Sequence, residues 1–106
     1  MAINNKKNPA FLFYSSDFLT GTMFMTNEQV GAYIRLLCAQ HQYGHLSLSQ
    51  VQNIAGEQTN VVLLKFITDE NGLYYNLRLE NILADREKFC ESRRQNRQKR
   101  EDKKSN

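Results

Sequence analysis

Residues 61–76, VVLLKFITDENGLYYN, contain the pattern that most restricts the fold. At its centre stands Asp69-Glu70-Asn71-Gly72, and the pair Asn-Gly favours a tight turn between two antiparallel strands. The apolar and aromatic residues on either side predict short strands at about residues 66–68 and 73–76. The apolar run at 61–66 fits either a short helix or a buried strand, because its spacing suits both periods. The pattern therefore predicts a β-hairpin, preceded by a segment of open assignment.

A long helix is predicted upstream, at about residues 27–43. Thr26 and Gln29 stand at the spacing of a capping box, and Gly44 is suited to end the helix because glycine adopts left-handed conformations without steric cost. The apolar stripe of this helix, with Tyr33 beside it, consists of Val30, Ile34, Leu37 and Cys38.

A second helix follows after Leu46, which is isolated among polar residues and suits a very short strand. Ser47 or Ser49 can cap this helix, and Gly56 ends it. If residues 61–66 form a third helix, three helices precede the hairpin, which is the order of a winged helix-turn-helix. Other small α+β domains also produce this order. The predicted core face of the second helix consists of Leu48, Val51, Ile54 and Ala55.

The segments at the two ends of this unit are also apolar in part. Residues 10–14 predict a buried strand or an extended packing segment, and residues 17–21 a turn or short helix with Phe18 and Leu19 in the core. Helical spacing returns at residues 78–91, which predict a helix packed on the body. Its apolar positions are Leu79, Ile82, Leu83, Phe89 and Cys90.

Positive charge is concentrated at the C-terminal end. Residues 1–85 contain five Lys or Arg and seven Asp or Glu, a net charge of −2, whereas residues 86–106 contain nine and four, a net charge of +5. Such a distribution points to an acidic partner, most commonly nucleic acid, although a solvated terminus has the same composition. We therefore expect a flexible N-terminus (1–9), a winged-helix domain (10–91) and a basic polar tail (92–106) that is a helical extension or disordered.

Several short motifs occur in a fixed order between about residues 11 and 100. They are Phe13-Tyr14 with Asp17-Phe18-Leu19, Met25, Gly31-Ala32-Tyr33-Ile34, Leu36-Leu37, Gly44-His45-Leu46 and, after the hairpin, Asn76-Leu77-Arg78-Leu79-Glu80. In this order they resemble the YdaU-like family of phage and prophage proteins, found at the N-terminus of phage replication proteins. The family usually has Arg where Val30 stands and Trp where Phe18 stands.

The resemblance implies a winged-helix fold and a role in phage or prophage DNA replication, as a DNA-binding module of the replisome-organiser or initiator type. It implies no catalytic residues. The alternative is a protein-interaction or self-association module of a phage replication protein, without direct DNA contact. The acidic hairpin and the apolar third helix favour this alternative, and the basic tail favours DNA.

Two regions are candidates for DNA contact. At the start of the third helix, Gln58 and Asn60 can pair with adenine, and Thr59 can contact a thymine methyl or a phosphate, although Thr59 or Asn60 can equally cap the helix. Lys65 adds one cation to this helix. The tail offers phosphate contacts of low sequence specificity, and Arg93, Arg97 and Arg100 fall on one face if it is helical. The cations of the tail are Arg93, Arg94, Arg97, Lys99, Arg100, Lys103 and Lys104.

Motifs of catalysis and of cofactor binding are not found in the sequence. It contains no phosphate-binding glycine loop, nucleophile elbow or metalloprotease signature, so we expect no enzyme, no cofactor and no small-molecule substrate. Cys38, His41 and His45 share one helical face, but their spacing matches no closed zinc pattern, and we predict no metal. With no signal peptide or apolar segment of membrane-spanning length, we expect a cytoplasmic protein of a bacterial host cell with reduced thiols.

Overall fold

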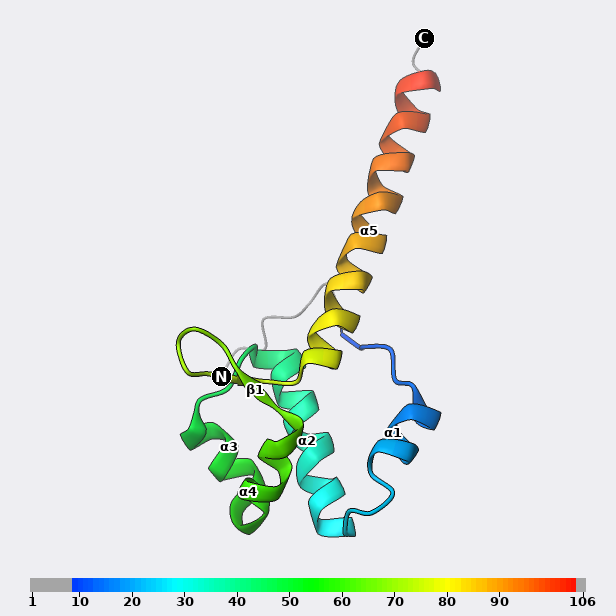
Figure 1. Ribbon diagram of the computed structural model, residues 1–106. Coiled ribbons are helices and arrows are strands. Elements are labelled where there is room, and N and C mark those ends of the chain that lie inside the picture. Colours follow the sequence, from blue (N-terminus) through cyan, green and yellow to red (C-terminus); the bar gives the residue numbers. More distant parts are fainter. Residues whose placement is uncertain (1–8, 105–106) are drawn as a thin grey trace.

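The computed structural model describes the backbone of residues 9–104 and the side chains of residues 9–89, 92 and 93. A helical body with a small two-stranded antiparallel sheet carries one long helix, α5 (Leu77–Lys104), which projects away from it (Figure 1). Because of this helix, the molecule measures 63 × 30 × 25 Å. Residues 1–8, most of the segment predicted to be flexible, lie outside the described residues.

The two main helices of the body begin at capping boxes. Helix α2 (Asn27–Tyr43) starts after Thr26, whose hydroxyl accepts from the Gln29 backbone N–H while the Gln29 side chain accepts from the Thr26 N–H. This helix ends, as predicted, at Gly44, where φ is 86°. Helix α3 (Leu48–Ala55) has the same arrangement, with Ser47 as its cap. The predicted bounds of both helices are confirmed.

Residues 10–14 form neither helix nor strand, and Tyr14 is extended, so the segment matches the second of its two expectations, an extended packing segment. The ring of Phe11 packs edge-on against His41, with 5.1 Å between the ring centroids. Helix α1 (Ser15–Gly21) follows, and its Phe18 stacks on Tyr33 of α2 at 5.6 Å. The predicted core position of Leu19 is wrong, since its side chain is 69% exposed. Successive helical residues are turned by about 100°, so a single contact face that takes Phe18 leaves Leu19 outside.

The segment of open assignment is helical but irregular. After the 3₁₀ turn η1 (Gly56–Gln58), residues 61–65 complete the single α-helical turn α4 (Thr59–Val62) and form the 3₁₀ turn η2 (Leu63–Lys65). Val62 is fully buried and anchors the segment against the other helices. The helix interpretation of the apolar run is therefore confirmed up to Lys65, and only the residues after it are extended.

The predicted hairpin is present with shorter strands, β1 (Ile67–Thr68) and β2 (Tyr74–Tyr75). Leu46 pairs with Tyr74 through two backbone hydrogen bonds of 2.8 and 2.6 Å, which confirms its predicted strand character. The turn starts at Asp69, whose carbonyl accepts from the Gly72 N–H, and Gly72 has a φ of 79°. Among the described residues, only glycines have a positive φ. In this turn Gly72 is therefore left-handed and Asn71 is not, although a tight turn of the Asn-Gly type would need both.

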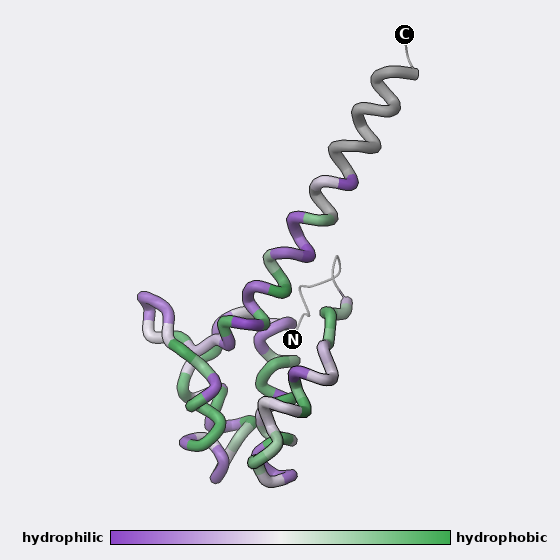
Figure 2. Tube along the Cα trace, turned by 45° about the vertical axis from the view of Figure 1, so that its right-hand side comes forward, coloured by the Kyte–Doolittle hydropathy of each residue, from purple (hydrophilic) through white to green (hydrophobic). Residues whose placement is uncertain are grey.

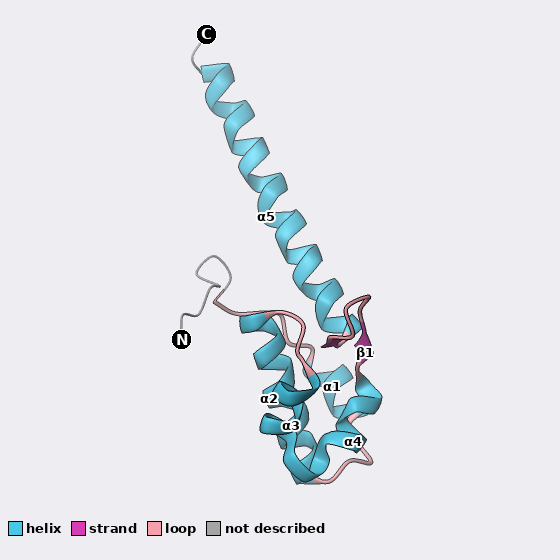
Figure 3. Ribbon diagram, turned by 90° about the vertical axis from the view of Figure 1, so that its left-hand side faces the viewer, coloured by secondary structure: helices cyan, strands magenta, loops and turns pink. Residues whose placement is uncertain are grey.

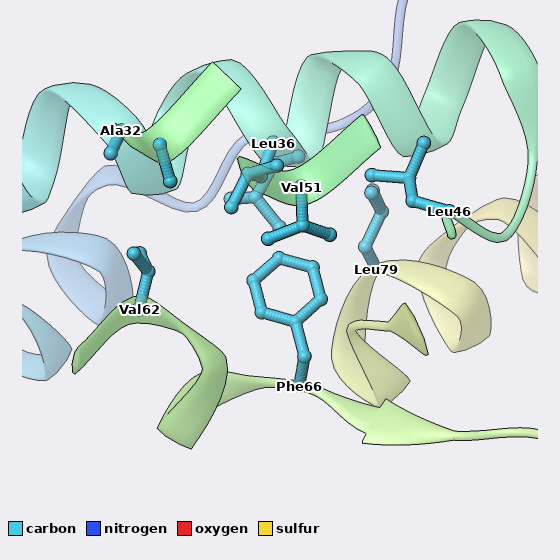
Figure 4. Close-up of a cluster of buried hydrophobic side chains, with 9 residues drawn as sticks. Ala32, Leu36, Leu46, Val51, Val62, Phe66 and Leu79 are labelled. Atoms are coloured by element: carbon cyan, nitrogen blue, oxygen red, sulfur yellow. The ribbon is translucent and has the colours of Figure 1, made fainter. Parts of the chain in front are cut away.

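The core lies between α2, α3, α4, the hairpin and the first turns of α5. Figure 4 shows the ring of Phe66 directed toward Val51 in the middle of this cluster. The predicted stripe of α2 is wrong at Cys38, which is exposed, and the predicted face of α3 is wrong at Leu48. Helix α2 instead places the side chains of Gln40 and His41 inside the body, because both polar residues have partners there. The buried apolar residues are Ala32, Leu36, Leu37, Leu46, Val51, Ala55, Val62, Phe66 and Leu79.

Helix α5 packs on the core of the body at its beginning. Asn76 caps it through an Oδ1 that accepts from the Leu79 N–H at 2.9 Å, and Leu79 is buried. The predicted packing of residues 78–91 on the core holds up to Leu83; side chains 84–89 are exposed, and Asp85, Arg86 and Phe89 border an open groove together with Leu12 and Tyr14. Figure 3 shows the helix leaving the body, and the hydropathy colours of Figure 2 show that, among the described residues, polar positions dominate beyond its first turns. Along the described chain, no helix has the length and apolar character needed to cross a membrane.

Candidate functional site

The basic segment continues α5 beyond the body. The helix extends to Lys104, so positions 93, 97, 100 and 104 fall on one helical face at spacings of four, three and four residues. Arg93 is exposed, and its guanidinium lies 5.8 Å from the centre of the Phe89 ring. The other predicted tail cations belong to this helix, but their side chains lie outside the described residues. They are Arg94, Arg97, Lys99, Arg100, Lys103 and Lys104.

The four candidates of the third helix differ in what they present to solvent. Thr59 is buried and its hydroxyl donates to the Gly56 carbonyl at 2.7 Å, so it presents no group to DNA and it is not a helix cap. Lys65 donates from Nζ to the Gly21 carbonyl at 2.8 Å and joins η2 to the end of α1. Asn60 is exposed and Gln58 is half-buried. Helix α4 lies at the end of the body away from α5, so the two candidate regions are not brought together (Figures 1 and 3).

A cluster that the sequence did not predict joins three segments around His45. The Nδ1 atom of His45 lies 2.6 Å from Oδ2 of Asp69 in the hairpin turn. Its Nε2 atom lies 2.6 Å from Oε2 of Glu80 in the first turn of α5. Tyr75 stacks on the imidazole with 4.2 Å between centroids and 7° between the ring planes. We call these four residues the His45 cluster.

The protonation of the His45 cluster follows from its contacts. Burial by itself lowers the pKa of His45, but hydrogen bonds to the two carboxylates and their negative charges outweigh it, so that the pKa is raised above the ordinary value of 6.5. The pKa of Asp69 is lowered, chiefly by the hydrogen bond from His45 and next by the backbone N–H of Leu73. Asp69 also accepts from the Asn71 N–H at 2.8 Å. These contacts favour an imidazolium between two carboxylates.

The contacts of Asp69 change the interpretation of the acidic hairpin. In the sequence, Asp69 and Glu70 make the hairpin acidic, which favoured protein interaction over DNA contact. Asp69 instead neutralises His45 and closes the turn, while Glu70 is exposed. Spacing could not have indicated this, because His45 is 24 residues from Asp69 and 35 from Glu80.

The zinc alternative has no supporting geometry. Cys38 is exposed, His41 is buried against Phe11 and Gln42, and both ring nitrogens of His45 bind carboxylates. Among the side chains that the structure describes, no three His, Cys, Asp or Glu residues are grouped so that they could hold a metal ion.

A small apolar cavity of about 80 Å³ lies between the N-terminal segment, α1, α2 and the start of α5. Its lining is mainly aromatic and aliphatic and includes Phe11, Phe18, Tyr33 and Ile82. At its edge Arg78 forms an ion pair with Asp17, and its guanidinium lies 5.7 Å from the centre of the Tyr14 ring. A cavity of this size and lining can take an apolar side chain.

Comparisons of the chain with models of protein families, with curated proteins and with solved structures find no match. The resemblance to the YdaU-like family therefore stays a prediction from the motifs quoted above.

Proposed function

We propose that this chain is a winged-helix DNA-binding module used in phage or prophage DNA replication, and that α5 makes its main contact with nucleic acid. The order of α2, the Leu46 strand, α3, α4 and the hairpin supports the winged-helix assignment. The motifs that resemble the YdaU-like family support the replication context.

The observation that carries this proposal is the position of the basic residues on a helix beyond the body. Helix α5 rises about 1.5 Å per residue, so positions 93–104 span about 16 Å along one side of a free helix. A single helix fits the major groove of B-DNA, and cations on it can engage several phosphates. Binding of this kind depends strongly on salt and weakly on sequence.

The body contributes little charge to this contact. Thr59 is buried and Asp69 binds His45; of the other candidates on the third helix, Asn60 is exposed, Gln58 is half-buried, and the exposed Lys65 donates to a backbone carbonyl. In this proposal the body positions α5 and does not read base edges with its own third helix.

The test is fluorescence anisotropy of labelled duplex and single-stranded DNA at several salt concentrations, with the full chain. A variant with Arg93, Arg94, Arg97 and Arg100 all replaced by Ala should lose affinity for every DNA sequence. The slope of log K against log salt concentration should also become flatter, by roughly 0.9 per lost phosphate contact on duplex DNA. The same four positions replaced by Lys provide the matched control and should retain the salt dependence. If the Ala variant binds as tightly as the wild type, or the wild type does not bind at low salt, the proposal fails.

A second candidate function is protein interaction, and exposed apolar side chains favour it. Phe24 is 98% and Leu64 is 84% exposed, and the Lys65–Gly21 bond holds their two segments next to each other. Exposed apolar groups in such number are typical of an interaction surface. Further exposed apolar side chains in the N-terminal part of the described chain are Leu12, Phe13, Tyr14, Leu19 and Met23.

Light scattering over a range of protein concentrations tests the second candidate. If the chain associates with itself through this surface, the variant with Phe24 and Leu64 replaced by Ser should remain monomeric at concentrations where the wild type does not. Replacement of the exposed Asn53 by Ser is the control, since it leaves the apolar surface unchanged. A wild type that is monomeric throughout contradicts self-association.

A further inference from the structure

We propose that His45 is a proton-dependent tie between the hairpin and helix α5: the doubly protonated imidazole holds Asp69 and Glu80 together, and loss of one proton releases Glu80 while Asp69 stays bound. This inference is independent of nucleic-acid binding. It concerns how firmly the first turn of α5 is attached to the body.

The geometry requires both ring nitrogens to donate. Asp69 and Glu80 each face His45 with an oxygen at 2.6 Å, and ionised carboxylates only accept hydrogen bonds. A neutral imidazole has one N–H and one lone pair, so it can satisfy one carboxylate and must turn its lone pair to the other. Only the imidazolium makes both contacts.

Near the ring, the titratable groups in contact with it among the described residues are Asp69 of the hairpin turn, Glu80 of α5 and the stacked phenol of Tyr75. The two carboxylates are the charges that act on His45, and both favour its protonated form. His45 therefore stays protonated at higher pH than an ordinary histidine, whose pKa is 6.5.

The two carboxylates are not equivalent, and this decides which contact opens. The other oxygen of Asp69, Oδ1, accepts from the N–H groups of Asn71 and Leu73, and the side chain is 18% exposed. The Glu80 side chain is 39% exposed and, within the part of the chain that the structure describes, its carboxylate accepts no further hydrogen bond. When one proton is lost, Asp69 is fixed by the turn, whereas Glu80 can rotate into water. The remaining proton therefore stays on Nδ1.

Release of Glu80 loosens α5 without detaching it. The N-cap bond from Asn76 and the buried Leu79 are unaffected by the charge of His45. A partly exposed ion pair contributes at most about 1 kcal/mol, which corresponds to a change of about two- to fivefold in local opening. The expected effect is a change in the protection of the first turn of α5 and not unfolding.

Nitrogen-detected NMR of the imidazole tests the proposal directly in the full chain. In a pH titration, the ring of His45 should titrate above the ordinary value of 6.5, and its neutral form should carry the proton on Nδ1. Replacement Glu80→Gln should lower the pKa of His45 and leave the tautomer unchanged, because the amide oxygen still accepts but has no charge. Titration at or below the ordinary value, or a neutral ring protonated at Nε2, would overturn the proposal.

Amide hydrogen exchange provides the second measurement. Across the titration of His45, protection at residues 80–83 should fall by about two- to fivefold after correction for intrinsic exchange, with no comparable step at residues 71–75. The His45→Gln variant should lack this step. Asp85→Asn removes a carboxylate of α5 that does not contact His45, and this control should keep the step. A step that persists in His45→Gln, or that occurs equally in the hairpin, contradicts the proposal.

Discussion

The side chain of Gln40 binds both backbone groups of Asn76, in the manner of a neighbouring strand. Its Oε1 accepts from the Asn76 N–H at 2.6 Å, and its Nε2 donates to the Asn76 carbonyl at 3.2 Å. The side chain of Asn76 in turn donates to the Lys65 carbonyl at 2.9 Å and accepts from the Leu79 N–H. Both residues are buried, so one amide pair connects α2, the end of η2, the hairpin and the start of α5.

Replacement of Gln40 by Leu should therefore destabilise the protein by about 1–3 kcal/mol, because the Asn76 N–H remains buried without an acceptor, while the Asn76 carbonyl keeps its bond from the Glu80 N–H. Urea unfolding measured by circular dichroism gives the free energy. The control is Gln52→Leu, which makes the same chemical change at an exposed position of α3 and should change stability by no more than about 0.5 kcal/mol. Equal effects of the two variants would mean that the Gln40–Asn76 pair does not contribute to the fold.

Leu36 and Leu64 form a second matched pair, since one is fully buried in α2 and the other is 84% exposed in η2. Leu36→Ala should cost about 2–5 kcal/mol, the range for a cavity in a packed core. Leu64→Ala should be close to neutral in stability. The same urea titrations measure both. A large loss with Leu64→Ala would show that this side chain is buried in solution, as in an associated state.

Two glycines should respond in opposite directions to replacement by Ala. Gly31 lies inside α2 with open space where a Cβ would stand, so Gly31→Ala should stabilise the helix by about 0.5–1 kcal/mol. Gly44 ends the same helix at φ 86° and ψ −157°, a region used almost only by glycine, so Gly44→Ala should cost about 1–3 kcal/mol. Thermal unfolding of the two variants checks both signs. Stabilisation by Gly44→Ala would mean that this backbone conformation is not maintained in solution.

The sequence predicted the parts of this fold that depend on local signals. Capping boxes place a hydroxyl and an amide three residues apart, so the starts of α2 and α3 could be predicted from Thr26 and Ser47. The hairpin and the Leu46 strand were also within reach, because turn residues and isolated apolar residues mark them. Local spacing did not reveal that α2 turns Gln40 inward and Cys38 outward. That choice depends on Asn76, which is 36 residues away from Gln40.

The candidate site was predictable only in its composition. The charge of the C-terminal segment is visible in the sequence, and its continuation of α5 follows from polar residues of good helix propensity. The His45 cluster was not predictable, since its members come from three segments that are far apart in the sequence. Thr59 was proposed for DNA contact from its residue type, and its burial depends on how η1 and α4 pack.

The stability difference between the wild type and His45→Gln should depend on pH in a defined way. The raised pKa of His45 contributes stability that is complete below the ordinary value of 6.5 and is lost as the pH rises through the pKa of the folded protein. The lowered pKa of Asp69 contributes stability that is complete above the ordinary value of 3.8 and is lost as the pH falls through its folded pKa. The free energy of unfolding of the wild type should therefore exceed that of the variant most at pH values between 3.8 and 6.5, and the difference should shrink at lower and at higher pH.

Urea midpoints of both proteins at closely spaced pH values measure this difference. Glu80→Gln should flatten the alkaline side of the profile, because it removes one of the two carboxylates that hold the proton on His45. Asp85→Asn, an exposed carboxylate elsewhere on α5, should leave the profile of the wild type unchanged. A difference that does not vary with pH would mean that His45 is not charged between its two carboxylates, and one that grows toward alkaline pH would mean that the neutral ring is the form that the fold prefers.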